Sequence, residues 1–259
     1  MELDDAYQNA AYIPGGDTYP DKWAQAAAAY RQQGLRELEV IYGNSPRQRV
    51  DIFHPRRLSK GLVIFVHGGY WLRFDKSFWS HLAAGPLAHG WTVAMPSYDL
   101  CPDVRITEIG QQVMGAISML AMRVPGPIRL VGHSAGGHLV ARSAVPNANA
   151  GWQDRLEKVV SVSPVADLAP LMRTSMNADL KIDAAEAAAE SPVHLAAPAC
   201  PCTVWVGADE RPVFLEQAAA LADAWSAAHH VAEDHHHFSV IEDLADPQSA
   251  LTREILDAT

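Results

Sequence analysis

The stretch Ile128-Arg129-Leu130-Val131-Gly132-His133-Ser134-Ala135-Gly136-Gly137 decides the fold. An apolar run of strand length leads directly into G-x-S-x-G, and helix-competent residues 138–144 follow. A strand, a sharp turn and a helix in this order are typical of a nucleophile elbow, whose turn strains the backbone of its serine. Strand and helix approach closely there, which favours Gly132 and Gly136. The sequence predicts Ser134 as a nucleophile at a helix N-terminus, where the Ala135 amide faces developing negative charge.

Short runs with β propensity recur on both sides of this stretch. They are residues 37–42, 49–54, 62–67, 91–96, 128–132, 159–163 and 203–207. Four of them, 62–67, 91–96, 128–132 and 203–207, are largely apolar, as in parallel strands that are buried on both faces. The first two runs mix in charged residues and are separated by the turn signal Gly43–Pro46, which favours an antiparallel hairpin at the sheet edge.

Helical segments separate several of these runs, so the chain is predicted to be α/β, with helices on both faces of a mostly parallel sheet. Apolar residues at helical spacing between Ile106 and Leu120 predict one helix that packs on the sheet. With 259 residues, 49% of them hydrophobic, we expect a single domain over residues 1–259. Residues 166–197 contain a helix-prone segment, 184–190, and no clear strand. We interpret them as an insertion, and a candidate lid, over the carboxyl ends of the strands.

A second motif, His67-Gly68-Gly69-Tyr70-Trp71, follows the buried run 62–67. Glycines after such a strand let backbone amides face a reacting carbonyl without an intervening side chain. We therefore predict an oxyanion hole made by the amides of Gly68, Gly69 and Ala135. His67 precedes the nucleophile in the chain, whereas the base of this arrangement follows it. We expect His67 to hold the loop by hydrogen bonds.

Aromatic side chains gather around this loop. Tyr70 and Trp71 are adjacent to the predicted oxyanion amides, and we expect one of them to face the pocket and stack on a flat substrate. Phe78 and Trp79 lie further along the chain and are interpreted as packing beneath the loop.

The acid that orients the base is expected after the nucleophile, just beyond the end of a strand. The run 203–207 ends at Gly207, and Ala208-Asp209-Glu210 follows. We predict Asp209 as the acid, with Glu210 as its neighbour. Asp167, which follows the run 159–163, is the main alternative, but its Asp-Leu-Ala-Pro context is more typical of the start of a helix.

The base is expected to be a histidine near the C-terminus. His237 is favoured because it directly precedes Phe238–Ile241, which we expect to open the final helix. His235 and His236 remain alternatives. Histidine is dense here, since His229, His230, His235, His236 and His237 fall within nine positions. Adjacent loop residues rarely converge on one ion, and Cys200-Pro-Cys202 has no second Cys/His pair at zinc spacing, so no metal site is predicted.

Charge and composition restrict the partners. The chain carries 20 Lys and Arg against 30 Asp and Glu, a formal net charge of −10, and it has no basic run that would bind nucleic acid or an anionic membrane. Residues 1–12 are acidic and do not resemble a secretion signal, and no apolar run reaches membrane-spanning length. We expect a cytoplasmic protein that acts on a small molecule without a cofactor. The sequence gives no indication of oligomeric state.

Five motifs together resemble the kynurenine formamidases (arylformamidases) and their esterase relatives, which have the α/β-hydrolase fold. The motifs are VHGGYW at 66–71, GHSAGGHL at 132–139, SPVHL at 191–195, GADERPVF at 207–214 and HFSVIEDL at 237–244. The resemblance implies the same triad, Ser134, Asp209 and His237, and hydrolysis of an N-formyl aromatic amide as the family's best-known activity.

The expected reaction is therefore conversion of N-formylkynurenine to kynurenine and formate through a formyl-enzyme. The alternative is a carboxylesterase of broad small-acyl specificity that uses the same residues with an alcohol leaving group. Thioesterase and peptidase activities, and a non-catalytic binding protein on the same scaffold, are further alternatives that the motifs favour less.

Overall fold

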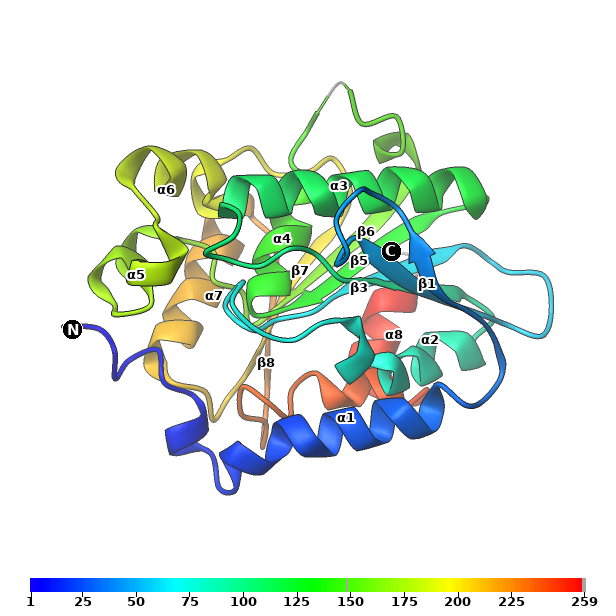
Figure 1. Ribbon diagram of the computed structural model, residues 1–259, viewed down its shortest axis with the longest axis horizontal. Coiled ribbons are helices and arrows are strands. Elements are labelled where there is room, and N and C mark those ends of the chain that lie inside the picture. The colour runs from blue at the N-terminus through cyan, green and yellow to red at the C-terminus, as the bar shows by residue number, and fades with distance from the viewer. Residues whose placement is uncertain (148, 258–259) are drawn as a thin grey trace.

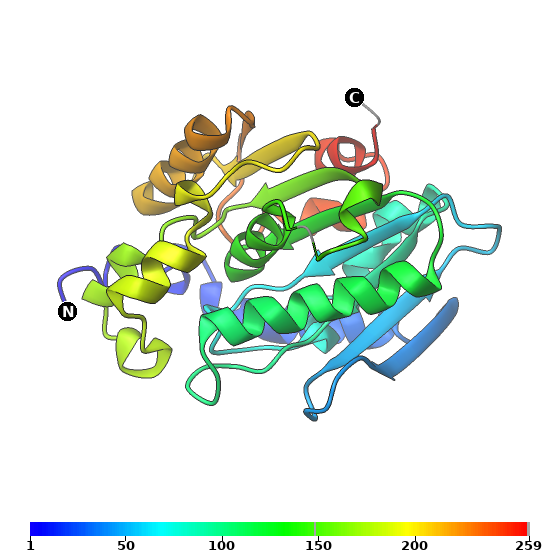
Figure 2. The same ribbon diagram turned by 90° about the horizontal axis from the view of Figure 1, so that it is seen from above.

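The computed structural model describes residues 1–147 and 149–257, and its centre is a twisted β-sheet (Figures 1 and 2). Within these residues the sheet has eight strands in the order β1-β2-β4-β3-β5-β6-β7-β8. The strands are β1 (Leu35–Ile41), β2 (Arg49–His54), β3 (Leu62–Val66), β4 (Thr92–Pro96), β5 (Ile128–His133), β6 (Leu156–Val162), β7 (Cys202–Gly207) and β8 (Ala228–Ala232).

Strands β3 to β8 run parallel, whereas β2 pairs antiparallel with both β1 and β4. This confirms the predicted parallel centre and the predicted antiparallel hairpin at one edge.

Helices cover both faces of the sheet, as predicted. They are α1 (Tyr19–Tyr30), α2 (Ala84–Ala88), α3 (Ile106–Arg123), α4 (Ala135–Ala144), α5 (Asn177–Leu180), α6 (Ala184–Glu190), α7 (Pro212–Trp225) and α8 (Ala250–Leu256). Helices α1, α2 and α8 lie on one face, and α3, α4 and α7 on the other (Figure 1). None of the helices in the described residues is both long enough and apolar enough to span a membrane.

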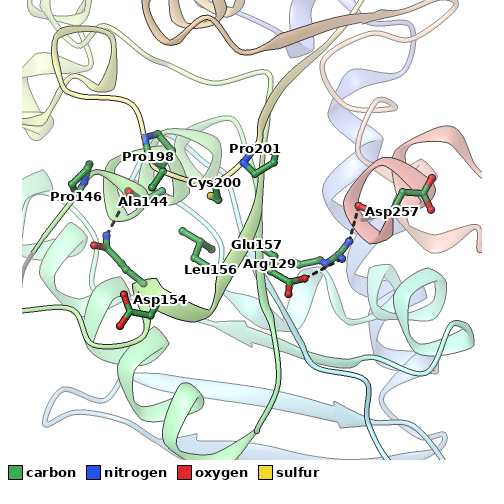
Figure 3. Close-up of a pocket in the computed structure, with 12 residues that line it drawn as sticks. Arg129, Ala144, Pro146, Asp154, Leu156, Glu157, Pro198, Cys200, Pro201 and Asp257 are labelled. Atoms are coloured by element: carbon green, nitrogen blue, oxygen red, sulfur yellow. Dashed lines mark hydrogen bonds and ion pairs between the residues drawn. The ribbon is translucent and has the colours of Figure 1, made fainter. Parts of the chain in front are cut away.

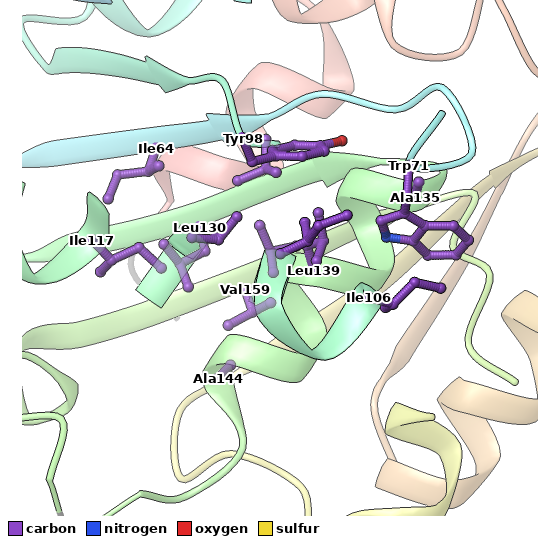
Figure 4. Packing of buried hydrophobic residues seen from close by; sticks show 14 of the residues in the cluster. Ile64, Trp71, Tyr98, Ile106, Ile117, Leu130, Ala135, Leu139, Ala144 and Val159 are labelled. Atoms are coloured by element: carbon purple, nitrogen blue, oxygen red, sulfur yellow. The ribbon is translucent and has the colours of Figure 1, made fainter. Parts of the chain in front are cut away.

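The buried clusters on the two faces of the sheet follow from the period of two along each strand. In β3, Ile64 packs beneath α3 and α4, whereas its neighbour Phe65 joins the cluster beneath α1 and α8. The predicted helical stripe is confirmed, because its five side chains are buried in one cluster: Ile106, Ile109, Val113, Ile117 and Leu120. Figure 4 shows Ile106 and Ile117 of this stripe. Each buried aliphatic side chain of this size contributes about 1.5–3 kcal/mol.

Two predictions about the C-terminal part are wrong or incomplete. Strand β8 was not predicted, because its sequence Ala-His-His-Val-Ala lacks an apolar pattern, and the reason is that β8 is an exposed edge strand. Residues 238–241, expected to open the final helix, form turns instead. A short 3₁₀ segment follows at Glu242–Ala245, and the α-helical hydrogen bonds of α8 begin only at Ala250.

The segment 166–197 lies between β6 and β7 and contains α5 and α6, with α6 spanning the predicted residues. Asp183 caps α6 by accepting a hydrogen bond from the Glu186 amide, which explains where this alanine-rich helix begins. Helix α6 is fixed to the start of α3, because Arg105 bonds the buried Glu186 carboxylate at 2.7 Å.

Candidate active site

Ser134 stands at a strained turn between β5 and α4. Its backbone angles are φ 57° and ψ −118°, and its side chain is nearly buried. The close packing predicted for the glycines is present. A Cβ on Gly132 would lie 2.1 Å from the Gly136 carbonyl oxygen, and a Cβ on Gly136 would lie 2.0 Å from that of Val66. The turn therefore exists only because these two positions lack side chains.

The loop after β3 lies beside this turn. A Cβ on Gly68 would approach the Ser134 Cβ at 3.0 Å, and Gly69 has a φ of 114° that favours glycine. Ala135 is the first residue of α4, so its amide is one of the unpaired donors at the helix start. Among the described residues, the amides of Gly68, Gly69 and Ala135 form no turn, loop or capping hydrogen bond. Three amides without such a bond therefore lie on the loop after β3 and at the start of α4, the two segments that meet at Ser134.

His67 fixes the loop from below, in line with its expected role. Its Nδ1 donates to the Gly68 carbonyl oxygen at 2.8 Å, and its ring stacks on Tyr98 with a centroid distance of 4.3 Å. The Tyr98 hydroxyl donates to the His67 carbonyl oxygen. Burial lowers the pKa of His67 to about 4, so the ring is neutral at physiological pH.

His237 is held by Glu210, and the prediction that Asp209 orients it is wrong. His237 Nδ1 lies 2.5 Å from Glu210 Oε2, and both side chains are buried. The other carboxylate oxygen, Oε1, accepts hydrogen bonds from the Gly207 amide at 2.9 Å and from the Ser163 hydroxyl. Asp209 is exposed.

The turn after β7 explains the one-residue shift. The Asp209 amide donates to the His235 carbonyl oxygen at 2.9 Å, and the Glu210 amide returns to the Gly207 carbonyl oxygen at 3.3 Å. This backbone arrangement turns the Asp209 side chain outward and the longer Glu210 side chain inward beneath His237. The motif places an acid after the strand, but which of two adjacent acids points inward depends on tertiary hydrogen bonds with the His235 loop.

Asp167, the alternative acid, lies elsewhere. Its Oδ1 accepts a hydrogen bond from the Ala169 amide at 2.9 Å, directly before the 3₁₀ turn Ala169–Arg173. This agrees with the interpretation of its context as the start of a helix.

Further residues, not identified from the sequence, position the His237 ring. His133 Nε2 donates to the His237 carbonyl oxygen at 2.8 Å, and burial lowers the pKa of His133 well below its ordinary value. Phe214 of α7 packs against the other side, with a centroid distance of 4.2 Å. His133 is part of the G-x-S-x-G motif, but nothing in its spacing shows that it bonds residue 237.

The remaining histidines of the cluster lie apart from the base. His229 and His230 are on the exposed strand β8. His235 Nε2 lies 3.4 Å from Asp243, and His236 Nε2 lies 3.1 Å from the Tyr19 hydroxyl. Across the described residues, no group of three or more His, Cys, Asp or Glu side chains could hold a metal ion.

Ser134 and His237 line one cavity of about 590 Å³. Gly68 and Gly69 line it as well, so the structure brings the predicted nucleophile, base and oxyanion loop together. Its walls are rich in aromatic side chains, namely Tyr7, Trp23, Tyr70, Phe74, Trp79 and Phe238. Several contact each other directly, with centroid distances of 4.6 Å for Trp23 and Trp79 and 5.3 Å for Trp23 and Phe238. A flat apolar group fits such walls.

The two predicted substrate contacts, Tyr70 and Trp71, lie in different environments. Tyr70 lines the cavity, and its hydroxyl donates to the Tyr7 carbonyl oxygen at 2.7 Å. The prediction for Trp71 is wrong, because its side chain is fully buried in the core (Figure 4). There it meets His138 edge-on at a centroid distance of 5.0 Å. Positive φ values at both residues turn the loop so that consecutive side chains point in different directions.

The N-terminal segment forms most of one cavity wall, which the sequence did not indicate. Residues between Asp4 and Trp23 line it, whereas the predicted lid contributes only Ser175 and Met176. An ion pair between Asp5 and Arg211, at 2.7 Å, holds this segment against the start of α7.

A second cavity, of about 640 Å³ (Figure 3), has lining residues at the opposite end of the strands. It is lined by Arg129 and Leu156, near the starts of β5 and β6, whereas Ser134 follows the end of β5. Five residues of strand separate Arg129 from Ser134, or roughly 16 Å. None of the predicted site residues lines this second cavity.

Comparisons with known proteins agree with the observed fold. The family described as the alpha/beta hydrolase fold matches residues 63–237, more than half of the chain. The chain is 28% identical to the kynurenine formamidase of Danio rerio over 242 residues, covering 85% of this chain and 80% of that protein. It is 29% identical to the kynurenine formamidase of Drosophila melanogaster over 245 residues, covering 86% and 81%.

Solved structures show the same fold. A crystal structure of a candidate thioesterase from Silicibacter sp. is 52% identical, covers 99% of this chain and 100% of its own, and has a TM-score of 0.97. Esterase B from Lactobacillus rhamnosis is 20% identical, with a TM-score of 0.66 and coverage of 92% and 90%, and this likeness shows the fold alone.

Proposed function

The chain belongs to the α/β-hydrolase family and is a hydrolase, and we propose that it is a serine hydrolase with the triad Ser134, His237 and Glu210. The observation that carries this proposal is the convergence of three parts on one cavity: a serine on a strained elbow, a histidine whose Nδ1 lies 2.5 Å from a buried carboxylate, and free amides beside the serine. Such an arrangement activates a hydroxyl and stabilises an oxyanion.

In the proposed first step, the Glu210 carboxylate accepts a hydrogen bond from Nδ1–H of His237 and leaves Nε2 free to accept a proton. Nε2 takes the Ser134 proton as Oγ attacks the carbonyl carbon. The negative charge develops on the carbonyl oxygen, which the amides of Gly68, Gly69 and Ala135 stabilise. Each such donor contributes about 3 kcal/mol in the transition state.

Collapse of this intermediate breaks the bond to the leaving group, and His237 returns its proton to the departing nitrogen or oxygen. An acyl-enzyme on Ser134 remains. Water, deprotonated by His237, then attacks the acyl carbon through a second tetrahedral intermediate and releases the acid. All proton transfers use His237, and the acyl group moves only through Ser134.

We propose an N-formyl aromatic amide as substrate, with N-formylkynurenine as the compound to test first. Two observations support this choice. The relatives named kynurenine formamidase match over 85% or more of this chain. The aromatic walls around Trp23 and Phe238 suit an aryl leaving group, while a formyl group needs little space beside Ser134.

Hydrolysis of small esters or thioesters is the second candidate function. The Silicibacter structure described as a candidate thioesterase favours it, because it is 52% identical to this chain over nearly its whole length. The triad and the oxyanion amides serve a formamide, an ester and a thioester alike, so the leaving-group pocket decides between them.

The test is kcat/KM for the purified protein on N-formylkynurenine, p-nitrophenyl acetate and S-phenyl thioacetate, with Ser134→Ala as the control. The proposal predicts the highest value for the formamide and loss of all activity in the variant. Turnover of the ester or the thioester without the formamide would keep the triad and overturn the substrate assignment. Activity retained by Ser134→Ala would overturn the serine mechanism itself.

A further inference from the structure

Two charged side chains at the cavity have no role in the chemistry described so far. Arg73 and Asp17 both line the cavity and are exposed. Among the described residues, neither side chain forms a hydrogen bond or an ion pair. One is a cation and the other an anion, and both belong to the lining of the cavity that contains Ser134 and His237.

Other charged side chains near the cavity form ion pairs or hydrogen bonds, unlike Arg73 and Asp17. Arg211 pairs with Asp5, and Arg173 pairs with Glu2. The other carboxylate that lines the cavity, Asp4, accepts a hydrogen bond from the Ser175 amide at 2.5 Å. Arg73 and Asp17 are therefore the charges at the cavity that remain available to a ligand.

Both residues are carried on well-defined backbone. The Arg73 amide donates to the Gly69 carbonyl oxygen at 3.0 Å, which fixes Arg73 on the same tight turn as an oxyanion residue. Asp17 sits in the 3₁₀ turn Gly16–Thr18, where the Thr18 hydroxyl donates to the Gly15 carbonyl oxygen at 2.7 Å. Gly16 packs so closely that a Cβ there would lie 2.3 Å from the Ala10 carbonyl oxygen.

The position of Asp17 in the chain adds a second argument. The family match covers residues 63–237, which include the nucleophile, the acid, the base and the oxyanion loop. Asp17 lies outside this range, on the N-terminal wall. The hydrolytic chemistry is thus supplied by the shared region, and a segment outside it contributes a charge to the pocket.

We propose that Arg73 and Asp17 are specificity-determining residues that bind the carboxylate and the ammonium of a zwitterionic amino-acid group on the leaving group. This rests on the proposed function. Arg73 donates to the carboxylate, and Asp17 accepts from the ammonium. The aromatic walls hold the ring between these contacts and Ser134. Neither residue takes part in bond making or breaking.

The experiment compares two substrates that share the formamide and the aryl ketone. N-formylkynurenine carries the amino-acid group, and 2-formamidoacetophenone lacks it. The variants are Arg73→Gln and Asp17→Asn. The controls, Arg57→Gln and Asp223→Asn, remove the same charges from exposed positions that do not line the cavity.

Arg73→Gln is expected to raise KM for N-formylkynurenine about tenfold, with kcat within about twofold, because a charged hydrogen bond in the bound state is lost. Asp17→Asn is expected to raise KM about fivefold, since Asp17 accepts from a single ammonium, whereas the Arg73 guanidinium can donate two parallel hydrogen bonds to a carboxylate. Neither variant should change KM for 2-formamidoacetophenone, and neither control should change KM for either substrate.

The assignment is wrong if the variants affect both substrates equally, or if they behave like the controls. In that case the proposed function still stands, because both formamides are hydrolysed. If the wild-type protein hydrolyses neither formamide but does hydrolyse p-nitrophenyl acetate, the formamidase proposal itself fails. The two failures are therefore distinguished within one set of assays.

Discussion

Replacing Glu210 by glutamine should abolish activity while leaving the fold intact. In the structure, Glu210 Oε1 accepts from the Gly207 amide and the Ser163 hydroxyl, whereas Oε2 faces Nδ1 of His237. A glutamine in this position must keep its oxygen toward the Gly207 donor. Its NH₂ group then points at Nδ1, which can no longer carry a proton. The His237 proton moves to Nε2, the atom that should accept the proton of Ser134.

The expected loss follows from this tautomer. A base locked in the wrong tautomer lowers kcat by about 10⁴-fold in serine hydrolases, and such a factor corresponds to about 5 kcal/mol of transition-state free energy. Asp209→Asn is the matched control, because Asp209 is adjacent and acidic but exposed. It should retain kcat within about twofold, as expected for a surface substitution without a contact to the base.

The assay is hydrolysis of p-nitrophenyl acetate by both variants, with thermal unfolding measured on the same samples. Glutamine is nearly isosteric with glutamate, so both melting curves should stay close to that of the wild type. A folded Glu210→Gln protein with near-normal kcat would show that Glu210 does not set the tautomer of His237. Inactivation by Asp209→Asn instead would return the role to the residue favoured from the sequence.

Three other predictions concern stability. Burial lowers the pKa of His67 and His138 to about 4, so the unfolded chain, with an ordinary histidine pKa near 6.5, binds protons first as the pH falls. The free energy of unfolding should be highest above about pH 7 and should decrease toward pH 4, by about 2 kcal/mol for each ring at pH 5. A urea midpoint concentration that is the same at pH 5 as at pH 7.5 would contradict this. Gly136→Ala should prevent soluble folding, because its Cβ would lie 2.0 Å from the Val66 carbonyl oxygen, and a stable, active variant would show that the elbow tolerates a side chain. Trp71→Ala should lower the free energy of unfolding by about 3–5 kcal/mol in chemical denaturation, while a raised KM without loss of stability would restore Trp71 as a substrate contact.

The features that short stretches of sequence determine by themselves could be predicted, namely the parallel strands, the edge hairpin and the elbow. Apolar runs identified the parallel strands, and the Gly43–Pro46 turn identified the edge hairpin, because burial on two faces and turn chemistry are both visible in composition. Strand β8 escaped because an exposed edge strand does not need apolar residues. The elbow was predictable because a close approach of strand and helix requires glycine at fixed positions.

The sequence predicted the acid that contacts His237 one residue away from its observed position, as Asp209 instead of Glu210. The choice between Asp209 and Glu210 depends on a backbone hydrogen bond to His235, which is distant in sequence. Trp71 was misassigned because positive φ values in the loop reverse the direction of adjacent side chains. The N-terminal wall could not be predicted, since its placement depends on individual contacts such as the ion pair of Asp5 with Arg211.

The central claim is that Ser134 is the nucleophile of a hydrolytic triad. Intact-mass measurement after treatment with a fluorophosphonate tests it most directly, because such a reagent phosphonylates an activated serine and stays attached. We expect one adduct per chain on the peptide that contains Ser134, and no adduct in Ser134→Ala. An unmodified wild-type protein, or an adduct that persists in Ser134→Ala, would contradict the claim.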